Sequence, residues 1–207
     1  MKGAIVLASA LFAALLAALA FGIACSSHQP ERYPAWQQDG AVLFGSSRQV
    51  SDFEFVDQYA VPRNQASFEK RWKLVFFGYT FCPDICPTTL AELNRVWKQL
   101  PEGVRAQWQV VFVSIDPARD TPAALEPYMT YFNPEFVALT GNPDSLRSVA
   151  GELNGFYARV ERGDGMAYLM DHSANLAVVS PDWHYRGYIE PPFWPGKMTT
   201  LLTELVQ

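Results

Sequence analysis

Two cysteines, Cys82 and Cys86, stand between an apolar run and a periodic apolar pattern, and this arrangement constrains the fold more than any other feature of the chain. The run from Leu74 to Tyr79 is short and aromatic-rich, as is typical of a buried strand. From Cys86 to Leu100, apolar residues recur at the spacing of a helix that buries one face. The sequence therefore predicts a strand, a tight cysteine loop and a helix in direct succession.

The position of this loop favours reactive thiols. Unpaired backbone N–H groups and the positive end of the helix dipole lie at the start of a helix. Such surroundings stabilise the thiolate, the form of cysteine that binds metals and attacks disulfides. A purely structural disulfide is the alternative in an exported domain, but a bridge across so short a loop removes little entropy from the unfolded chain. We therefore predict that Cys82 and Cys86 form a redox-active pair.

Strands and helices alternate along the rest of the chain. Apolar runs predict strands at 108–115, 136–139, 157–160, 174–179 and 184–189, and helices are expected to begin at Thr121-Pro122, at Asn142-Pro143 and at Lys197. Strand–helix alternation followed by a late hairpin is typical of an α/β sheet with helices on both faces. Together with a cysteine motif between an early strand and a helix, it predicts a thioredoxin-like fold with a central mixed sheet.

The N-terminus is a candidate membrane tether. Apart from Lys2 it carries no charge, and the apolar stretch from Gly3 to Ala24 is long enough to span a bilayer but also resembles a signal peptide. The residues around Cys25 resemble a lipoprotein cleavage site, so residues 1–25 are either a signal that leaves Cys25 lipid-anchored or an uncleaved anchor. Both interpretations place the remainder on the periplasmic side of a bacterial cytoplasmic membrane.

The remainder divides into an arm and one domain. Residues 26–49, which contain several Pro, Ser and Gln, are predicted to be a tether or a loosely packed arm. Residues 50–207 have enough apolar content for a single core and are predicted to be one thioredoxin-like domain. The chain has a net charge of −5 and no basic run, which argues against a nucleic-acid partner.

One histidine is placed to join the cysteines. The chain has 3 histidines; His28 lies in the predicted arm and His184 follows an exposed-looking turn. His172 lies in a predicted loop just before the strand at 174–179, and in a thioredoxin-like sheet that loop lies beside the cysteine loop. The alternative is a histidine satisfied by local hydrogen bonds. Asp171 and Ser173 are its neighbours and could orient its ring.

Two thiolates and one imidazole form a donor set that suits copper. Thiolates favour Cu(I), and two sulfurs with one nitrogen can also hold Cu(II). A structural zinc site would need four protein ligands, and the nearest fourth candidate, Asp84, is better placed as a helix cap. A three-ligand site near the surface suits an ion that is passed on rather than kept.

Four runs of sequence carry a resemblance to a known family. They are GYTFCPDICPTTLAEL at 78–93, VSIDPARDTP at 113–122, ALTG at 138–141 and DHS at 171–173. In this order and spacing the chain resembles the Sco/SenC family from about Val50 to Val206. The resemblance implies a thioredoxin-like fold, a membrane tether and a copper site made by Cys82, Cys86 and His172. Phe81 stands where many family members have a histidine.

The resemblance also implies a function. It points to a membrane-tethered copper metallochaperone that helps assemble the binuclear copper centre of cytochrome c oxidase, with the copper-bearing oxidase subunit or another periplasmic copper protein as partner. The alternative is a thiol–disulfide oxidoreductase that keeps the cysteines of that centre, or of other exported proteins, reduced. Three residues separate the cysteines, more than in the CxxC motif of dedicated oxidoreductases, which favours copper.

A charged cluster follows the strand at 108–115. Asp116, Arg119 and Asp120 are expected either to pair with one another in a solvated turn or to tune the cysteines and dock a partner, because the ends of neighbouring strands meet near the cysteine loop. Asp116 is therefore a candidate supporting residue of the copper site, with Asp84, Asp171 and Ser173.

Overall fold

The structure, a computed structural model, describes residues 36–206 except 39 and 69. The predictions for residues 1–25, including Cys25, and for residues 26–35 of the predicted arm lie outside the described part of the chain. Within the described part of the chain, no helix is both long and apolar enough to cross a bilayer.

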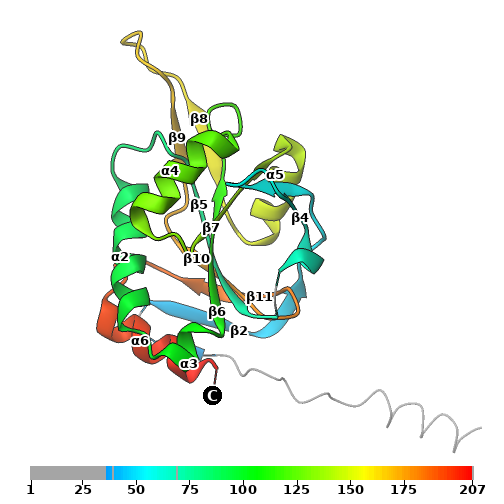
Figure 1. Ribbon diagram of the computed structural model, residues 1–207, viewed down its shortest axis with the longest axis vertical. Helices are drawn as coiled ribbons and strands as arrows, with labels where there is room; N and C mark the ends of the chain where they lie inside the picture. The colour runs from blue at the N-terminus through cyan, green and yellow to red at the C-terminus, as the bar shows by residue number, and fades with distance from the viewer. Residues whose placement is uncertain (1–35, 39, 69, 207) are drawn as a thin grey trace, which may run out of the picture. The chain divides into compact units, whose positions relative to one another are not determined.

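A mixed sheet forms the centre of the domain (Figure 1). Its central strands β5 (Trp72–Gly78), β6 (Trp108–Ser114) and β7 (Val137–Gly141) are parallel. Antiparallel strands flank them, in the order β10 (Leu176–Val179), β11 (His184–Ile189), β2 (Ala41–Gln49) and β1 (Trp36–Gln38) beyond β5, and β3 (Phe55–Asp57) and β4 (Pro62–Arg63) beyond β7. The predicted mixed sheet and late hairpin are confirmed.

Every residue of β5 and β6 is buried. Strands covered on both faces need apolar side chains in both directions, which explains why these two read as continuous apolar runs rather than as an alternating pattern. Their parallel register aligns Gly78 with Ser114, so the segments that follow both strands leave the sheet at the same edge. The cysteine loop follows β5 at this edge.

Helices cover both faces of the sheet. Helix α2 (Ile85–Gln99) packs against α4 (Pro122–Phe132) and α6 (Pro195–Glu204) on one face, and α5 (Pro143–Glu152) lies on the other (Figure 1). A Cβ added at Gly155, just after α5, would lie 2.8 Å from the ring of Phe77, so this side of β5 is closely covered. Two short helices, α3 (Glu102–Arg105) and the 3-10 helix η1 (Gln65–Ser67), lie in connections.

The predicted helix starts are correct to within a few residues, but the caps differ. The Asn142 side chain accepts a hydrogen bond from the backbone N–H of Asp144 and caps α5 as expected. Asp84 and Thr121 occupy the cap positions of α2 and α4 without a side-chain hydrogen bond to the helix. The predicted capping role of Asp84 is therefore wrong.

The domain begins before the predicted boundary at residue 50. Residues 41–49 form β2, which pairs with β11, and both Ala41 and Leu43 are buried. The prediction of a loose arm is therefore wrong for this segment. Its second half, GSSRQ, is polar and largely exposed, so it lacks the apolar pattern of a strand, although Arg48 and Gln49 pair with Tyr185 and His184 of β11.

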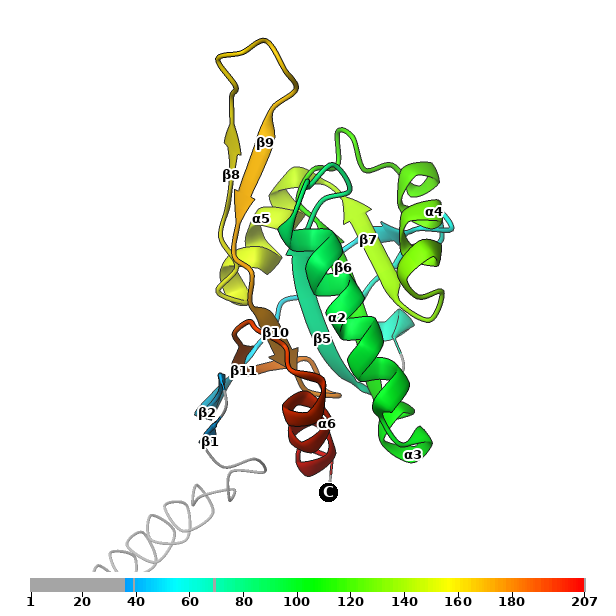
Figure 2. The ribbon, with the colours of Figure 1, turned by 90° about the vertical axis from the view of Figure 1, so that its left-hand side faces the viewer.

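A long hairpin departs from the body of the domain. Strands β8 (Tyr157–Val160) and β9 (Leu169–His172) pair with each other in a separate two-stranded sheet. The hairpin extends beyond the other elements (Figures 1 and 2). His172 is the last residue of β9 rather than part of a loop, which corrects the sequence-based prediction.

Candidate metal centre

The cysteine loop places its two sulfurs differently. Cys82 is half-buried in the loop, whereas Cys86 is fully buried as the second residue of α2. At Gly78, the last residue of β5, an added Cβ would lie 2.9 Å from the Cys86 Sγ atom and 2.7 Å from the ring of Phe112. Only glycine leaves room for the helix to bring Cys86 so close to the strand.

A buried carboxylate fastens the start of this loop. Asp120 accepts hydrogen bonds from the Thr80 backbone N–H at 3.0 Å, from the Thr80 hydroxyl at 2.5 Å and from the Ser114 hydroxyl at 2.6 Å. Burial raises the pKa of Asp120, and these hydrogen bonds oppose the rise. Asp120 therefore ties the loop after β6 to the cysteine loop.

The two sulfurs have opposite ionisation preferences. A hydrogen bond from the Cys86 thiol lowers the pKa of Cys82 to about 3 against the opposing effect of burial, with further help from His172 and from backbone N–H groups. One of these is the Cys86 N–H, which lies 3.4 Å from the Cys82 Sγ atom. The same contact with Cys82, together with burial, raises the pKa of Cys86. The pair thus holds one thiolate and one thiol that share a hydrogen bond.

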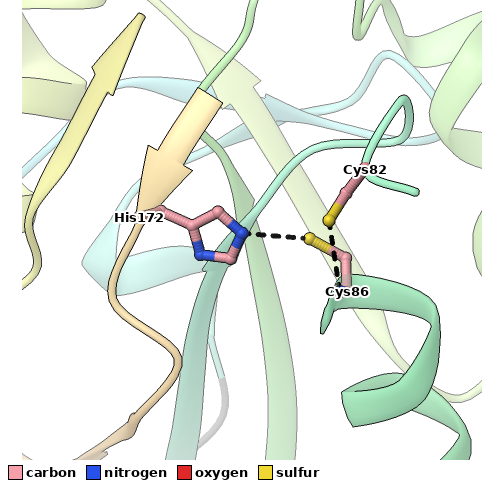
Figure 3. Close-up of side chains that lie close together, drawn as sticks. All are labelled: Cys82, Cys86 and His172. Atoms are coloured by element: carbon pink, nitrogen blue, oxygen red, sulfur yellow. Dashed lines mark hydrogen bonds between the residues drawn. The ribbon is translucent and has the colours of Figure 1, made fainter. Parts of the chain in front are cut away.

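His172 presents its ring to these sulfurs (Figure 3). Its Nε2 atom lies 3.3 Å from the Cys86 Sγ atom, and its Nδ1 atom lies 3.0 Å from the backbone oxygen of Ser173. A carbonyl can only accept, so Nδ1 carries a proton and Nε2 faces the sulfurs. The edge-on rings of Phe76 and Tyr79, each with its centroid 6.0 Å from that of the imidazole, confine it further.

The charge state of the imidazole follows from these contacts. Burial lowers the pKa of His172, but the contact with Cys82 and the hydrogen bond to the Ser173 carbonyl outweigh it, so the net shift is upward. The raised pKa means that Nε2 also binds a proton more readily than in a free imidazole. An ion bound between the sulfurs would compete with this second proton for Nε2.

The three side chains form a metal-ligand group. One ligand atom from each of Cys82, Cys86 and His172 lies within 4.8 Å of the other two. Two sulfurs and one nitrogen suit copper in either oxidation state, whereas a closed zinc site would need a fourth ligand. Because Asp84 is exposed and lies outside this group, the group found among the described residues provides three donors, which leaves a fourth coordination position without a protein ligand.

The other predicted supporting residues take different positions. Ser173 orients His172 through its backbone oxygen, while its hydroxyl bonds with the backbone of Phe156. Asp171 is exposed and affects the pKa of His172 only through its charge. Asp116 is buried, pairs with Arg119 and accepts a hydrogen bond from the Tyr168 hydroxyl at 2.8 Å.

Sequence reasoning missed Tyr168 and the supporting role of Asp120. Tyr168 precedes β9 and lies four residues before His172, a spacing that puts both on the same face of an extended segment. That signal becomes visible only if 168–172 is recognised as extended, and the expected strand began at residue 174.

Fold and site together define a thioredoxin-like protein with an open site for a soft metal. A model of the SCO1/SenC family matches residues 44–207, which is most of the chain. The chain therefore belongs to the SCO1/SenC family.

Known relatives cover most of its length. A protein of Stutzerimonas stutzeri that is named for copper binding is 38% identical over 91% of this chain and 93% of its own. A SCO2-like protein of Rickettsia conorii is 37% identical over 73% of this chain and 74% of its own.

Solved structures share the fold. The apo Sco1 protein of Thermus thermophilus superposes with a TM-score of 0.71 at 33% identity, covering 83% of this chain and 99% of its own. The copper-bound ScoI protein of Bradyrhizobium japonicum does so with a TM-score of 0.69 at 29% identity, covering 76% of this chain and 99% of its own. The thioredoxin-like prediction is confirmed for the domain.

Proposed function

We propose that this protein is a copper metallochaperone that binds one copper ion through Cys82, Cys86 and His172. The observation that carries the proposal is the convergence of their three ligand atoms within 4.8 Å. The similarity to a solved structure that holds copper supports the choice of metal.

The open side of the site suits transfer. Cys82 is half-buried and exposed Phe81 and Ile85 flank the cysteine loop, so a recipient's ligand can approach from the Cys82 side while Cys86 and His172 still hold the ion. Ligand exchange then moves copper without releasing it to water. Both cysteines must be reduced for loading, because a disulfide does not supply two thiolates.

The recipient and location are part of the proposal. We assign the recipient to the copper-bearing subunit of cytochrome c oxidase, and a membrane tether on the periplasmic side to the apolar residues 3–24. The tether would hold the domain near a membrane-embedded recipient and raise the frequency of encounters.

A copper titration with a ligand count tests the metal site. The full chain, reduced and kept in detergent, is titrated with Cu(I) and with Cu(II), and X-ray absorption counts the sulfur and nitrogen ligands. We expect two sulfurs and one nitrogen from the protein. His172→Ala should lose the nitrogen and weaken Cu(II) binding by more than the roughly 10- to 100-fold that loss of a supporting residue typically costs.

His184 provides the matched control. It lies in β11 and contacts Asp182 rather than the sulfurs, so His184→Ala should bind copper as the unaltered protein does. If His172→Ala also binds copper normally, the imidazole is not a ligand and the metallochaperone proposal is wrong.

A thiol–disulfide oxidoreductase is the second candidate. The low pKa of the half-buried Cys82 favours it. The Cys82 thiolate would attack a partner disulfide, form a mixed disulfide and release one partner thiolate; Cys86, once deprotonated, would attack the Cys82 sulfur and release the other. Two electrons pass to the partner and a Cys82–Cys86 disulfide remains. This cycle does not use His172, so His172→Ala should retain it.

A further inference from the structure

His172 reaches the metal site from outside the main sheet. It ends β9, whose strand pairing is with β8 in the separate hairpin. The bonds between Ser173 and Phe156 also close the hairpin upon itself. Whether the imidazole meets the sulfurs therefore depends on what holds this hairpin against the cysteine loop.

Arg119 lies at the junction between these segments. Its guanidinium carbon is 3.7 Å from the ring centre of Tyr168, 4.8 Å from that of Phe81 and 5.6 Å from that of Tyr79. Tyr168 leads into β9, whereas Tyr79 and Phe81 belong to the segment between β5 and Cys82. One cation thus contacts the aromatic rings of both segments that carry the metal ligands.

Hydrogen bonds fix the orientation of this cation. The Nη1 group of Arg119 donates to the backbone oxygen of Tyr168 at 2.9 Å, and Nε pairs with Asp116. Asp116 in turn accepts from the Tyr168 hydroxyl at 2.8 Å, which closes a ring of contacts. Nη2 is buried and finds no acceptor among the described residues. Burying an N–H group without an acceptor costs free energy, and the cation–π contacts with the surrounding rings offset part of it.

We propose that Arg119 and Tyr168 form a latch that positions His172 against Cys82 and Cys86. This inference rests on the proposed function, since it concerns the same metal site. Arg119 does not touch the ion; it is a positioning residue that acts on the imidazole through β9.

The latch acts on the nitrogen ligand more than on the sulfurs. Tyr168 and His172 lie on the same face of an extended segment, roughly 13 Å apart at the rise of a strand. Loss of the contacts at Tyr168 frees β9 to shift, and a shift of β9 moves the backbone that carries the imidazole relative to the sulfurs. Cys82 and Cys86 have independent support, because Asp120 holds the loop and α2 holds Cys86. Cu(II) binding, which benefits from the nitrogen, should therefore suffer more than Cu(I) binding through two thiolates.

Arg119→Met in the full chain is the first test. Methionine keeps an unbranched apolar side chain but removes the planar cation and its hydrogen bonds. We expect Cu(II) affinity to fall roughly 10- to 100-fold, Cu(I) affinity to fall by a much smaller factor, and the nitrogen coupling in the Cu(II) electron paramagnetic resonance spectrum to weaken. In the metal-free protein, amide hydrogen exchange in Leu169–His172 should become faster.

Tyr168→Leu tests the latch from its other side and leaves the Asp116–Arg119 pair in place. It should reproduce both the selective loss of Cu(II) affinity and the faster exchange in β9, even if Arg119→Met does not fold. Arg159→Met is the matched control. The guanidinium carbon of Arg159 lies 3.8 Å from the ring centre of Tyr168. However, the Arg159 side chain is 56% exposed, and it forms an ion pair with Glu161 of the hairpin. The Arg159→Met variant should bind copper, and exchange its amide hydrogens in β9, as the unaltered protein does.

The outcomes are decisive for the latch. Unchanged exchange and Cu(II) affinity in Tyr168→Leu overturn it, as does an equal loss of Cu(I) and Cu(II) affinity. An Arg159→Met effect as large as that of Tyr168→Leu also overturns it, because the latch is then not specific to Arg119. Failure of the proposed function looks different: in that case His172→Ala binds copper normally, while the exchange measurement still reports on the latch.

Discussion

Cys82 and Cys86 face different surroundings although they belong to one short loop. Cys82 is half-buried and receives hydrogen bonds, whereas Cys86 is completely buried within the first turn of α2. The hydrogen bond between them makes one sulfur a stable thiolate at the expense of the other. Reaction with an external electrophile or a partner disulfide should therefore begin at Cys82.

Alkylation of the reduced, metal-free protein tests this difference. Because the pKa of Cys82 is lowered to about 3, its reaction with iodoacetamide should be nearly independent of pH between about 5 and 8. Cys86 should react slowly throughout, and mass spectrometry of the peptides distinguishes the two. Cys86→Ala is the companion variant: a methyl group donates no hydrogen bond to the thiolate, so the pKa of Cys82 should rise and its alkylation rate should fall as the pH decreases. A pH-dependent rate at Cys82 in the unaltered protein would contradict the assignment.

At the scale of elements, the site depends on how closely α2 approaches the end of β5. Gly78 makes that approach possible, because its missing side chain leaves room for the Cys86 sulfur and the Phe112 ring. The parallel pairing of β5 with β6 then brings Asp120 beneath the cysteine loop. The presence of these strands and of the helix is not enough to form the site. The start of α2 must also lie close to the end of β5.

Gly78→Ala should disturb both packing and metal binding. Its Cβ would lie 2.7 Å from Phe112 and 2.9 Å from the Cys86 sulfur, and overpacking of this kind typically costs about 1–3 kcal/mol. We expect a lower free energy of unfolding in urea and weaker binding of Cu(I), because the sulfur must move. Gly151→Ala, in helix α5 with nothing within 4 Å of its added Cβ, is the control. It should be neutral or stabilising by roughly 0.5–1 kcal/mol, and equal losses in both variants would refute the packing argument.

Across the whole domain, the metal site and the start of the described chain lie at different ends. The cysteine loop and the hairpin occupy one end, and β1, β2 and α6 lie toward the other (Figure 2). Strand β2 pairs with β11, and β1 pairs with the outer edge of β2. These two strands therefore extend the sheet on one side, although they precede the thioredoxin-like core in the sequence.

Truncation tests this part of the architecture. A chain that begins at Val50 loses the burial of Ala41 and Leu43 and leaves β11 as an open edge. We expect its free energy of unfolding to fall by about 2 kcal/mol or more and its tendency to aggregate to rise. A chain that begins at Ala35 retains both strands and serves as the control. Equal urea midpoints for the two chains would show that residues 35–49 add nothing to the fold.

The sequence alone was enough to predict the local structure around the two cysteines. The strand before Cys82, the helix after Cys86 and the alternation that follows all depend on neighbours within a few positions, where periodicity carries the information. The choice of His172 needed one step more, namely the expectation that a thioredoxin-like sheet brings a late segment beside an early one. That expectation is confirmed, although the residue ends a strand rather than lying in a loop.

Contacts between distant segments were decided by the tertiary structure. Cys86 and His172 are 86 positions apart, and Arg119 contacts both Tyr168, 49 positions after it, and Phe81, 38 positions before it. No short pattern records such pairs, because their approach depends on strand order and on the path of the hairpin. The polar end of β2 is hard to recognise in the sequence for a related reason, because Arg48 and Gln49 pair with Tyr185 and His184 of β11, far along the chain. The sequence determined which atoms are available to hold an ion, and the folded chain determined that they meet.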